Sequence, residues 1–225
     1  MRFVPHFSDG RPFSQPLGKI VCVGRNYAEH ARELNNPVPS APLLFIKPAT
    51  SAASLEEPIA DPFERGEVHF ETELALLVGE TLTGASPQAA ARAVAGVGLA
   101  LDLTLRDVQA RLKEKGHPWE IAKAFDGACP LSSFVAIDTV PDWNALTFSL
   151  DIDGERRQTG HGSDMLFAVP ALLAEMSQHF TLEPGDVVLT GTPAGVGPLP
   201  RDGELHFMLS LAGKSALELT TRTAD

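Results

Sequence analysis

The sequence predicts an α+β fold built on a large mixed sheet system. Short apolar stretches typical of strands outnumber helical stretches, and no regular alternation of strand and helix indicates a parallel sheet. Gly and Pro, with 19 and 18 residues, are spread along the chain, which favours short strands joined by turns. A chain of 225 residues can bury one substantial core, so we predict a single domain over residues 1–225, with an N-terminal hairpin at residues 1–18 as an appendage.

Turn residues separate the elements predicted for the first half of the chain. A turn at Ser8-Asp9-Gly10 closes the N-terminal hairpin. A helix over residues 27–34 has to end before Pro37, and Ser86 can cap a helix over residues 87–95. Residues rich in Pro, Glu and Asp predict a loop over 53–66. Apolar runs predict strands over residues 19–23, 43–47, 68–78 and 97–103.

The second half alternates helical and strand-like patterns. Asp153-Gly154 is a strong two-residue hairpin signal. Turn residues dominate positions 116–134, and TGTPAGVG over residues 190–197 reads as a Gly-rich loop. Helical patterns cover residues 104–115 and 165–180, and strand patterns cover residues 145–151, 155–159, 186–190, 206–211 and 216–221.

Composition excludes several classes of protein. The formal net charge of −11, with no basic arm or stripe, argues against a nucleic-acid partner. The N-terminal segment contains no continuous apolar core of a signal peptide, and no apolar run is long enough to span a membrane. Cys22 and Cys129 lack metal-type spacing and fit reduced thiols, although their spacing leaves a single disulfide open. We therefore expect a cytoplasmic protein with no membrane partner.

Three acids interrupt stretches that are otherwise apolar. Glu71 and Glu73 lie within VHFETELALLV, and Asp102 lies within VGLALDLTL. Glu71 and Glu73 point to the same side of a strand, so their charges repel, and a third acid brought near would add to the repulsion. A divalent cation would relieve it, and an all-oxygen ligand set suits magnesium, manganese or calcium. Glu71 and Glu73 on the solvent face of a half-exposed strand remain the alternative, although Ala75 and Leu77 continue that face as apolar.

The helix predicted over residues 27–34 carries His30 and Glu33, three residues apart on one face. A carboxylate beside an imidazole fixes its tautomer and raises its basicity, which makes a general base usable near neutral pH. A routine charged pair on a solvated helix is the alternative, because such pairs are common on surfaces.

Polar residues also follow Asp102. Arg106 and Gln109 are three apart on a predicted helix and can donate hydrogen bonds to a carboxylate or keto oxygen. Lys123 lies in the largely apolar EIAKAFDGACP, where either a snorkelling side chain or an electrostatic role would explain it. In TGTPAGVG, small residues and the Thr192 hydroxyl could approach an anion, but a tight turn explains the loop equally well. His69 shares the strand parity of the acids and could support the site from behind.

Taken together, these segments resemble the fumarylacetoacetate hydrolase family, in its short single-domain branch of acylpyruvate hydrolases and oxaloacetate decarboxylases. The resemblance covers roughly residues 20–219. It rests on the order and spacing of IVCVGRNYAEHARE, PLLFIKP, HFETELALLVG, LALDLTLRDVQ, KGHPWEIAKAFDGACP and LTGTPAGVG. One stretch departs from the family pattern: RQTGHGSDMLF contains an unusual His161-Gly162, which we expect to shape the distal part of the substrate pocket.

The resemblance implies a mixed β-sandwich roll with short flanking helices, usually as a homodimer. It implies Mg²⁺ or Mn²⁺ held by Glu71, Glu73 and Asp102, with His30 and Glu33 on a short lid helix. Positions that surround the metal and the pyruvoyl end of the substrate in relatives are matched here by Arg25, Lys47, Arg106, Gln109, Lys123 and Thr192.

The resemblance also implies a metal-dependent hydrolase that cleaves the C–C bond of a small 2,4-diketo acid, an acylpyruvate or fumarylpyruvate, and releases pyruvate. In that reaction His30, oriented by Glu33, activates water, and Lys123 stabilises the pyruvate enolate. The same enolate forms when oxaloacetate is decarboxylated. The alternatives are an oxaloacetate decarboxylase or tautomerase, and a 2-oxo acid isomerase or hydratase of aromatic catabolism. A non-catalytic binding protein would have no reason to combine these acids, this dyad and these cations.

Overall fold

The computed structural model describes residues 3–33, 37–60, 63–139 and 142–224, so residues 1–2 of the expected hairpin, Leu34 of the expected first helix and residues 61–62 of the expected loop lie outside the described residues. A mixed sheet forms the centre of the fold, with strand order β2-β1-β12-β5-β6-β8-β3 and β9 added beside β6. The pairs β1–β12 and β3–β8 are parallel and the others are antiparallel. Its strands are β1 (Ile20–Gly24), β2 (Leu43–Lys47), β3 (Ala52–Ser54), β5 (Thr72–Val78), β6 (Val94–Leu101), β8 (Cys129–Leu131), β9 (Val135–Ala136) and β12 (Val187–Leu189).

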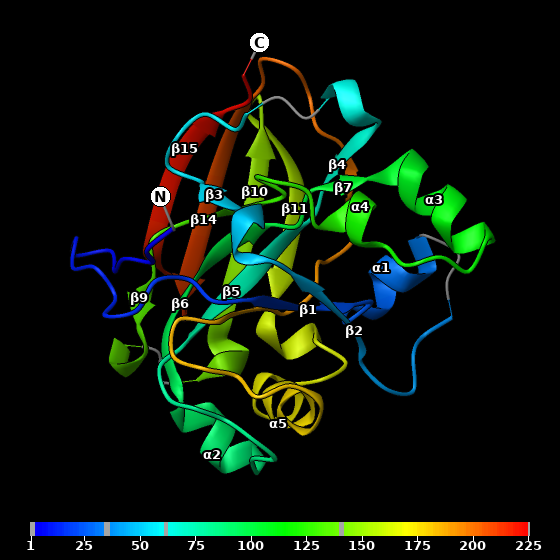
Figure 1. Ribbon diagram of the computed structural model, residues 1–225. Helices are drawn as coiled ribbons and strands as arrows, with labels where there is room; N and C mark the ends of the chain where they lie inside the picture. The colour runs from blue at the N-terminus through cyan, green and yellow to red at the C-terminus, as the bar shows by residue number, and fades with distance from the viewer. Residues whose placement is uncertain (1–2, 34–36, 61–62, 140–141, 225) are drawn as a thin grey trace.

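A second, antiparallel sheet packs against the first (Figure 1). In spatial order it contains β11 (Glu155–His161), β10 (Leu146–Ile152), β14 (Glu204–Leu211) and β15 (Lys214–Arg222). The predicted Asp153-Gly154 turn joins β10 to β11, with both residues at positive φ as a tight hairpin turn requires. Buried apolar side chains from both sheets, among them Leu76 and Phe207, fill the space between them. The predicted α+β class with a mixed sheet system is confirmed.

The strand expected over residues 68–78 is broken at Glu71. Its first part, β4 (Val68–Phe70), leaves the central sheet and pairs with β13 (Gly197–Pro198) and β7 (Thr104–Leu105) in a small third sheet. The helix expected from residue 104 accordingly begins at residue 106. The hydrogen bond from the backbone N–H of Asp102 to the carbonyl of Glu71, at 2.8 Å, is the last one between the two chain segments before β4 turns away to its own partners.

Short helices flank the sheets: α1 (Ala28–Glu33), α2 (Pro87–Arg92), α3 (Arg106–Glu114), α4 (Glu120–Lys123) and α5 (Val169–His179). In Figure 1, α1, α3 and α4 lie together on one side of the molecule, and α2 and α5 lie at one end. Helix α5 starts at Val169 rather than residue 165, because the backbone N–H groups of Leu166 and Phe167 donate to Asn26 instead of joining a helix. Helix α4 falls in the region expected to be turns. None of the helices in the described ranges is long and apolar enough to cross a membrane.

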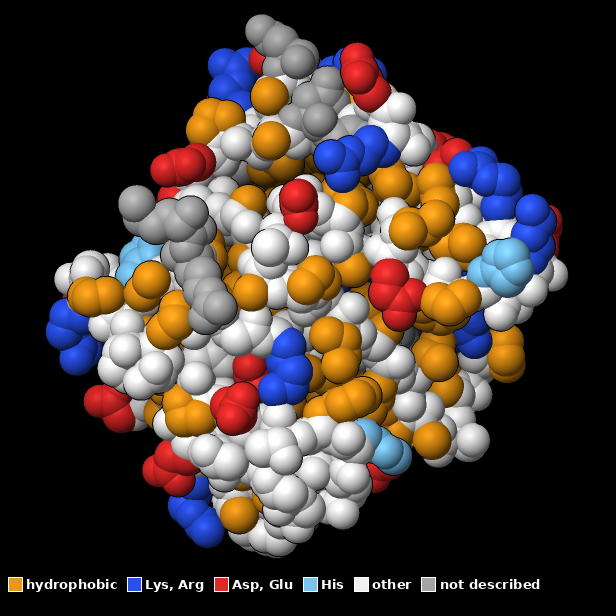
Figure 2. Space-filling view, viewed as in Figure 1, with side chains coloured by type: hydrophobic (Ala, Val, Ile, Leu, Met, Phe, Trp, Pro, Cys, Tyr) orange, Lys and Arg blue, Asp and Glu red, His pale blue; other side chains and the backbone are white. Residues whose placement is uncertain are grey.

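The outer face of the central sheet carries a second apolar cluster. The N-terminal segment covers it with Phe3, Phe7 and Phe13, and residues 6–8 exchange backbone hydrogen bonds with Phe134. Figure 2 shows hydrophobic side chains spread over the middle of this view, with charged side chains mainly toward its edges. Cys22 and Cys129 lie in the cluster as free thiols, and burial raises the pKa of Cys129 to about 12. Because both faces of the central sheet are covered, every residue of β5 is buried.

Candidate active site and metal centre

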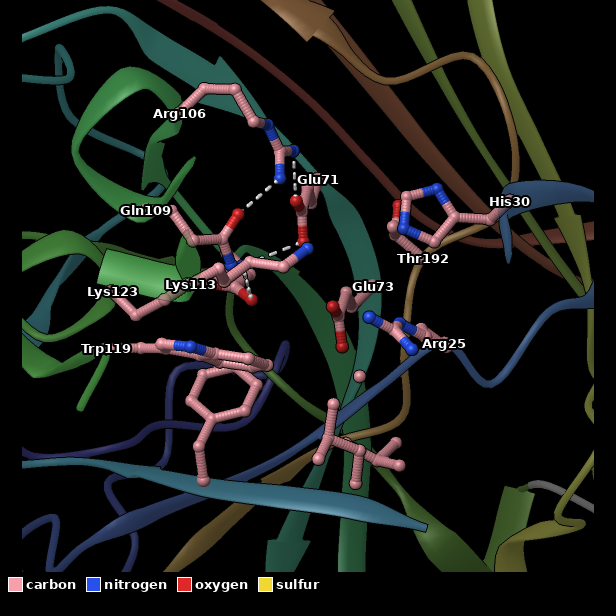
Figure 3. A pocket seen from close by; sticks show the side chains of 15 residues that line it. Arg25, His30, Glu71, Glu73, Arg106, Gln109, Lys113, Trp119, Lys123 and Thr192 are labelled. Carbon is pink, nitrogen blue, oxygen red and sulfur yellow. Dashed lines mark hydrogen bonds and ion pairs between the residues drawn. The ribbon is translucent and has the colours of Figure 1, made fainter. Parts of the chain in front are cut away.

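A narrow cavity of about 50 Å³ opens between α1 on one side and α3 and α4 on the other. Figure 3 shows Arg25 and His30 entering it from one side, and Arg106, Gln109, Lys113, Trp119 and Lys123 from the other. Nine of the eleven residues expected at the site line the cavity: Arg25, His30, Glu71, Glu73, Asp102, Arg106, Gln109, Lys123 and Thr192. The two that do not are Glu33 and Lys47.

The three acids meet at the bottom of this cavity. Glu71, Glu73 and Asp102 are 6%, 2% and 1% exposed, and one oxygen of each lies within 4.8 Å of the others. The register of β5 and β6 brings them together, since it carries Asp102 to the position opposite Glu71. The solvent-face alternative for the glutamates is therefore wrong: Ala75 and Leu77, on the same side of β5 as Glu73, belong to the second buried cluster.

Cations neutralise two of the acids. Lys123 Nζ lies 2.9 Å from Glu71 Oε2 and 2.6 Å from Asp102 Oδ2, and Arg106 is hydrogen-bonded to the other oxygen of Glu71. Burial opposes the charged form of Lys123, but Asp102 and Glu71 outweigh it and raise the lysine pKa. Burial likewise opposes ionisation of Glu71, but Lys123 and Arg106 lower its pKa. The pairs hold these groups in their charged forms.

Glu73 is different, because it has no ion-pair partner among the residues that the structure describes. Its carboxylate accepts one hydrogen bond, from the backbone N–H of Gly191 at 2.5 Å. Burial first, and then the charges of Asp102 and Glu71, raise the pKa of Glu73 well above its usual value. A divalent cation among the three carboxylates would remove that repulsion, and carboxylate oxygens are the ligands that Mg²⁺ and Mn²⁺ prefer. The residues present therefore fit such an ion.

Lys47 lies behind the acids rather than in the cavity. Its side chain is fully buried, with Nζ 2.8 Å from Asp102 Oδ1 and 3.1 Å from the carbonyl oxygen of Ala128. It also donates to the carbonyl oxygen of Lys123, and so ties α4 to the acid cluster. The family resemblance places Lys47 around the substrate, whereas in this structure Lys47 is buried behind the acids and supports them.

Helix α1 brings His30 to the cavity but not into a hydrogen bond with Glu33. His30 Nδ1 and Glu33 Oε2 are 3.7 Å apart, which is too long for a hydrogen bond. Both oxygens of Glu33 instead accept from the backbone N–H of Gly195, at 3.1 and 3.2 Å. Burial, the largest influence, lowers the pKa of His30 and outweighs the opposing charges of Glu71 and Glu33. A neutral imidazole thus faces the cavity, while Glu33 fastens α1 to the Gly-rich loop.

The Gly-rich loop over residues 190–197 forms one wall of the site. Gly195 has φ +96°, and a Cβ there would lie 2.1 Å from the carbonyl oxygen of Arg157, so only glycine fits without a shift of backbone. Thr192 lines the cavity, and its hydroxyl accepts a hydrogen bond from Gln158 Nε2 at 2.8 Å. The loop is therefore both a tight turn and part of the site.

The cavity is also lined by residues that the sequence did not predict as site residues. Lys113, Trp119 and Phe45 line the cavity, and the rings of Phe45 and Trp119 meet edge to face with centroids 6.2 Å apart. Lys113 could have been predicted, because it follows Gln109 by four residues and therefore lies on the same face of the helix.

Two buried amides organise the walls. Asn26 Nδ2 donates to the carbonyl oxygens of Thr190 and Phe167, and Gln158 joins β11 to β5 through the N–H of Thr72. No pattern in the sequence identifies them, because their partners are distant along the chain.

Two histidines singled out in the sequence lie outside the cavity. His69 hydrogen-bonds to Glu67 at 2.9 Å and does not line the cavity, because the chain breaks at Glu71 and the parity argument ends there. His161 and Gly162 do not line the cavity either. Gly162 packs against the carbonyl of Trp143, where an added Cβ would lie 2.1 Å away. Local packing therefore accounts for Gly162, whereas the side chain of His161 is exposed.

Comparison with known proteins gives consistent relatives. The chain matches the domain family described as fumarylacetoacetate (FAA) hydrolase C-terminal over residues 19–219. It is 51% identical to an oxaloacetate tautomerase of Escherichia coli over 89% of this chain and 92% of that protein. It is 45% identical to a mitochondrial oxaloacetate tautomerase of Bos taurus, over 91% and 96%. A mitochondrial oxaloacetate decarboxylase of Dictyostelium discoideum is 44% identical, over 80% and 84%.

Solved structures show the same fold. A candidate fumarylacetoacetate isomerase/hydrolase from Oleispira antarctica has a TM-score of 0.94 and 52% identity, covering 97% of this chain and 98% of that chain. Fumarylpyruvate hydrolase from Pseudomonas aeruginosa, solved in complex with Mn²⁺ and pyruvate, has a TM-score of 0.88 and 33% identity, covering 99% and 96%.

Proposed function

Because the chain belongs to the fumarylacetoacetate hydrolase family, we propose that it is a metal-dependent enzyme that interconverts the enol and keto forms of oxaloacetate. The observation that carries the proposal is the 51% identity to an oxaloacetate tautomerase over 89% of this chain. The buried acids, the paired cations and the neutral His30 supply a site suited to that reaction.

Glu71, Glu73 and Asp102 are the residues that would hold the metal, for which we propose Mg²⁺ or Mn²⁺. A related fumarylpyruvate hydrolase contains Mn²⁺ together with pyruvate, which supports an ion of this kind beside a 2-oxo acid. When bound, such an ion would polarise the 2-oxo group and stabilise negative charge that develops on its oxygen.

The protein's own residues would move one proton. In the keto-to-enol direction a proton leaves C3, and the C–H electron pair forms the C2–C3 double bond as the C2 oxygen takes up charge. We assign the proton at C3 to His30, which is neutral and lines the cavity. The Lys123 ammonium, held charged by Asp102 and Glu71, stabilises the enolate oxygen. The oxygen then takes up a proton from the His30 imidazolium, which returns to its neutral form. The reverse sequence gives the keto form, and neither direction consumes water.

Tautomerisation fits this site better than the C–C bond hydrolysis that the family resemblance first suggested. Hydrolysis needs an activated water, and the His30–Glu33 dyad expected to provide it is not hydrogen-bonded, since Glu33 is bound to Gly195. Decarboxylation of oxaloacetate is the second candidate. It passes through the same enolate, and the Dictyostelium discoideum relative supports it.

The test compares three reactions of one protein with Mg²⁺ and with EDTA. Loss of enol absorbance from oxaloacetate measures tautomerisation, and pyruvate release measures both decarboxylation and hydrolysis of acetylpyruvate. We expect tautomerisation to be the fastest, to stop in EDTA and to fall in His30→Asn but not in the exposed His179→Asn control. Faster pyruvate release from acetylpyruvate, or tautomerisation unaffected by EDTA, would contradict the proposal.

We also propose how the protein assembles and where in the cell it is located. We propose a homodimer through the outer face of the central sheet, where Phe3, Phe45 and Ala52 are only partly buried over the second apolar cluster. Light scattering of the purified protein would give the mass of a dimer if this is right and of a single chain if it is wrong. We also propose a cytoplasmic location, although related tautomerases include mitochondrial proteins.

A further inference from the structure

One face of α3 runs from the acids to the mouth of the cavity. Arg106, Gln109 and Lys113 line the cavity and are spaced by three and four residues, so they follow one another along that face. Arg106 is bound to Glu71 and to Gln109 Oε1, the latter at 2.8 Å. Lys113, one turn further on, is exposed and has no hydrogen-bond or ion-pair partner among the described residues. Figure 3 shows its side chain extending over the cavity.

Arg25 mirrors Lys113 on the other side of the cavity. Its backbone has φ +62°, a conformation that is costly for a residue with a Cβ and that calls for a compensating role. The neighbouring Asn26 fixes this bend through hydrogen bonds to Thr190 and Phe167. The Arg25 guanidinium enters the cavity and, within the described part of the chain, has no ion-pair partner either.

The charges of the site leave a surplus of positive charge. Glu71, Glu73 and Asp102 contribute three negative charges when ionised, and Lys123, Arg106 and Lys47, which contact two of these acids, contribute three positive charges. Arg25 and Lys113 are then left over, in a protein whose formal net charge is −11. Burial, and then the charges of Arg25 and Arg106, lower the pKa of Lys113 and outweigh the opposing charge of Glu71.

We propose that Lys113, together with Arg25, binds the second carboxylate of a four-carbon 2-oxo dicarboxylic acid and so determines the specificity of this site. This inference rests on the proposed function, because it presumes that the first carboxylate and the 2-oxo group lie beside the acids. A monocarboxylic 2-oxo acid of the same size would leave both cations unpaired. The site therefore selects by charge at the distal end of the substrate, through residues that do not contact the reacting carbon.

The experiment uses the full-length protein with Mg²⁺ and two substrates of equal size. Oxaloacetate carries a distal carboxylate, and its 4-amide, 2-oxosuccinamate, is uncharged there. We expect Lys113→Gln to lower kcat/KM for oxaloacetate roughly tenfold, mainly through KM, and to leave kcat/KM for the amide within about twofold. Lys115→Gln is the matched control, because Lys115 ends the same helix outside the cavity. An equal loss for both substrates, or no loss for oxaloacetate, would overturn the inference.

A binding arm separates this inference from the proposed function. 3,3-Difluoro-oxaloacetate and its 4-amide have no C3 hydrogen and cannot tautomerise, so calorimetric titration reports the charge preference without turnover. Tighter binding of the dianion by the wild-type protein, lost in Lys113→Gln and kept in Lys115→Gln, would support the site even if tautomerisation were absent. Equal affinity for the two analogues, or binding of neither, would overturn the inference even if the protein proved to be a tautomerase.

Discussion

The two sides of the cavity are built in different ways. At the acid side, Glu71, Glu73 and Asp102 are buried where β5 and β6 diverge. Lys47, Lys123 and Arg106 hold Glu71 and Asp102, and the backbone N–H of Gly191 holds Glu73. At the lid side, the six-residue helix α1 buries His30 and Ala31, and its carboxylate contact with the Gly-rich loop is made by Glu33, whose side chain is 35% exposed. The acid side is thus fixed by a network of buried charges, and the lid side by two buried side chains and one partly exposed carboxylate.

The difference indicates a division of tasks. Buried charges that are removed from their partners are costly, so the acid side has to form with the fold and stay formed. A short helix that buries only two side chains and is tied by one partly exposed carboxylate can open at a lower cost than a buried charge network, because exposed charged contacts contribute little to stability. We therefore expect substrate entry and release on the lid side, and changes at the two sides should have effects of different size and kind.

Asp102→Asn should have the largest effect. The amide keeps the shape of the side chain but removes one of the three charges that would hold the metal, and it weakens two contacts to lysines. We expect tautomerase turnover to fall by more than roughly a thousandfold, and the thermal midpoint to stop responding to Mg²⁺. Asp126→Asn, at an exposed aspartate outside this cavity, should leave both unchanged. A variant at residue 102 that kept its Mg²⁺ response would contradict the assignment.

Lys47→Met separates support of the acids from contact with substrate. The variant leaves Asp102 without one of its two cations and removes the donor to two carbonyl groups, all in a fully buried place. We expect the free energy of unfolding, measured in urea, to fall by about 3 kcal/mol. Lys214→Met, at the exposed first residue of β15, should change it by less than about 0.5 kcal/mol. A loss at Lys47 as small as that of the control would remove the contrast between the two sides.

Glu33→Gln tests the lid side alone. An amide keeps one acceptor oxygen for the N–H of Gly195 but loses the charge that strengthens both contacts. We expect the unfolding free energy to change by less than about 1 kcal/mol, while KM for oxaloacetate rises several-fold. Glu29→Gln, an exposed residue of the same helix, is the control. A large loss of stability would show that α1 belongs to the rigid part of the fold.

The smallest effect concerns pH. Burial lowers the pKa of His30 below its ordinary value of 6.5, so the neutral ring persists as the pH falls through 6.5. The loss of tautomerase activity at low pH should therefore occur below pH 6.5. In the same window the unfolded chain binds a proton that the folded chain does not, so the free energy of unfolding should fall as the pH drops. His30→Gln should flatten that dependence, and an unchanged slope would show that another group is responsible.

Much of the fold could be read from patterns along the chain, and the departures from those patterns are caused by partners that are distant in sequence. The Asp153-Gly154 hairpin was predictable because it depends on two adjacent residues. The break at Glu71 was not, because it depends on the pairing of β4 with β7 and β13, which are distant in sequence. The late start of α5 depends on Asn26, which is distant in sequence from the residues it binds. The periodicity of apolar residues indicates the secondary structure that a segment itself favours. It does not identify the distant partner whose contacts change that structure.

The same distinction between local patterns and distant contacts applies to the residues of the site. The acids were predictable because charge in an apolar stretch needs compensation, whatever the tertiary structure. The roles of Lys47 and Glu33 were not, because both are set by contacts with Ala128, Lys123 and Gly195 that only the folded chain reveals. Trp119 and Gln158 left no signal at all. Lys113 has the helical spacing that places it on the same face as Gln109, but nothing in the sequence says how far the cavity extends along that face.

The glycine at position 195 has a practical consequence for anyone who wishes to enlarge this enzyme's substrate range. With a Cβ only 2.1 Å from the Arg157 carbonyl, the wall it forms has no spare room, and libraries randomised there should return few folded variants. The opposite rim, formed by the side chains of Lys113 and Trp119, bears on open solvent. Redesign toward bulkier acids should begin at that rim.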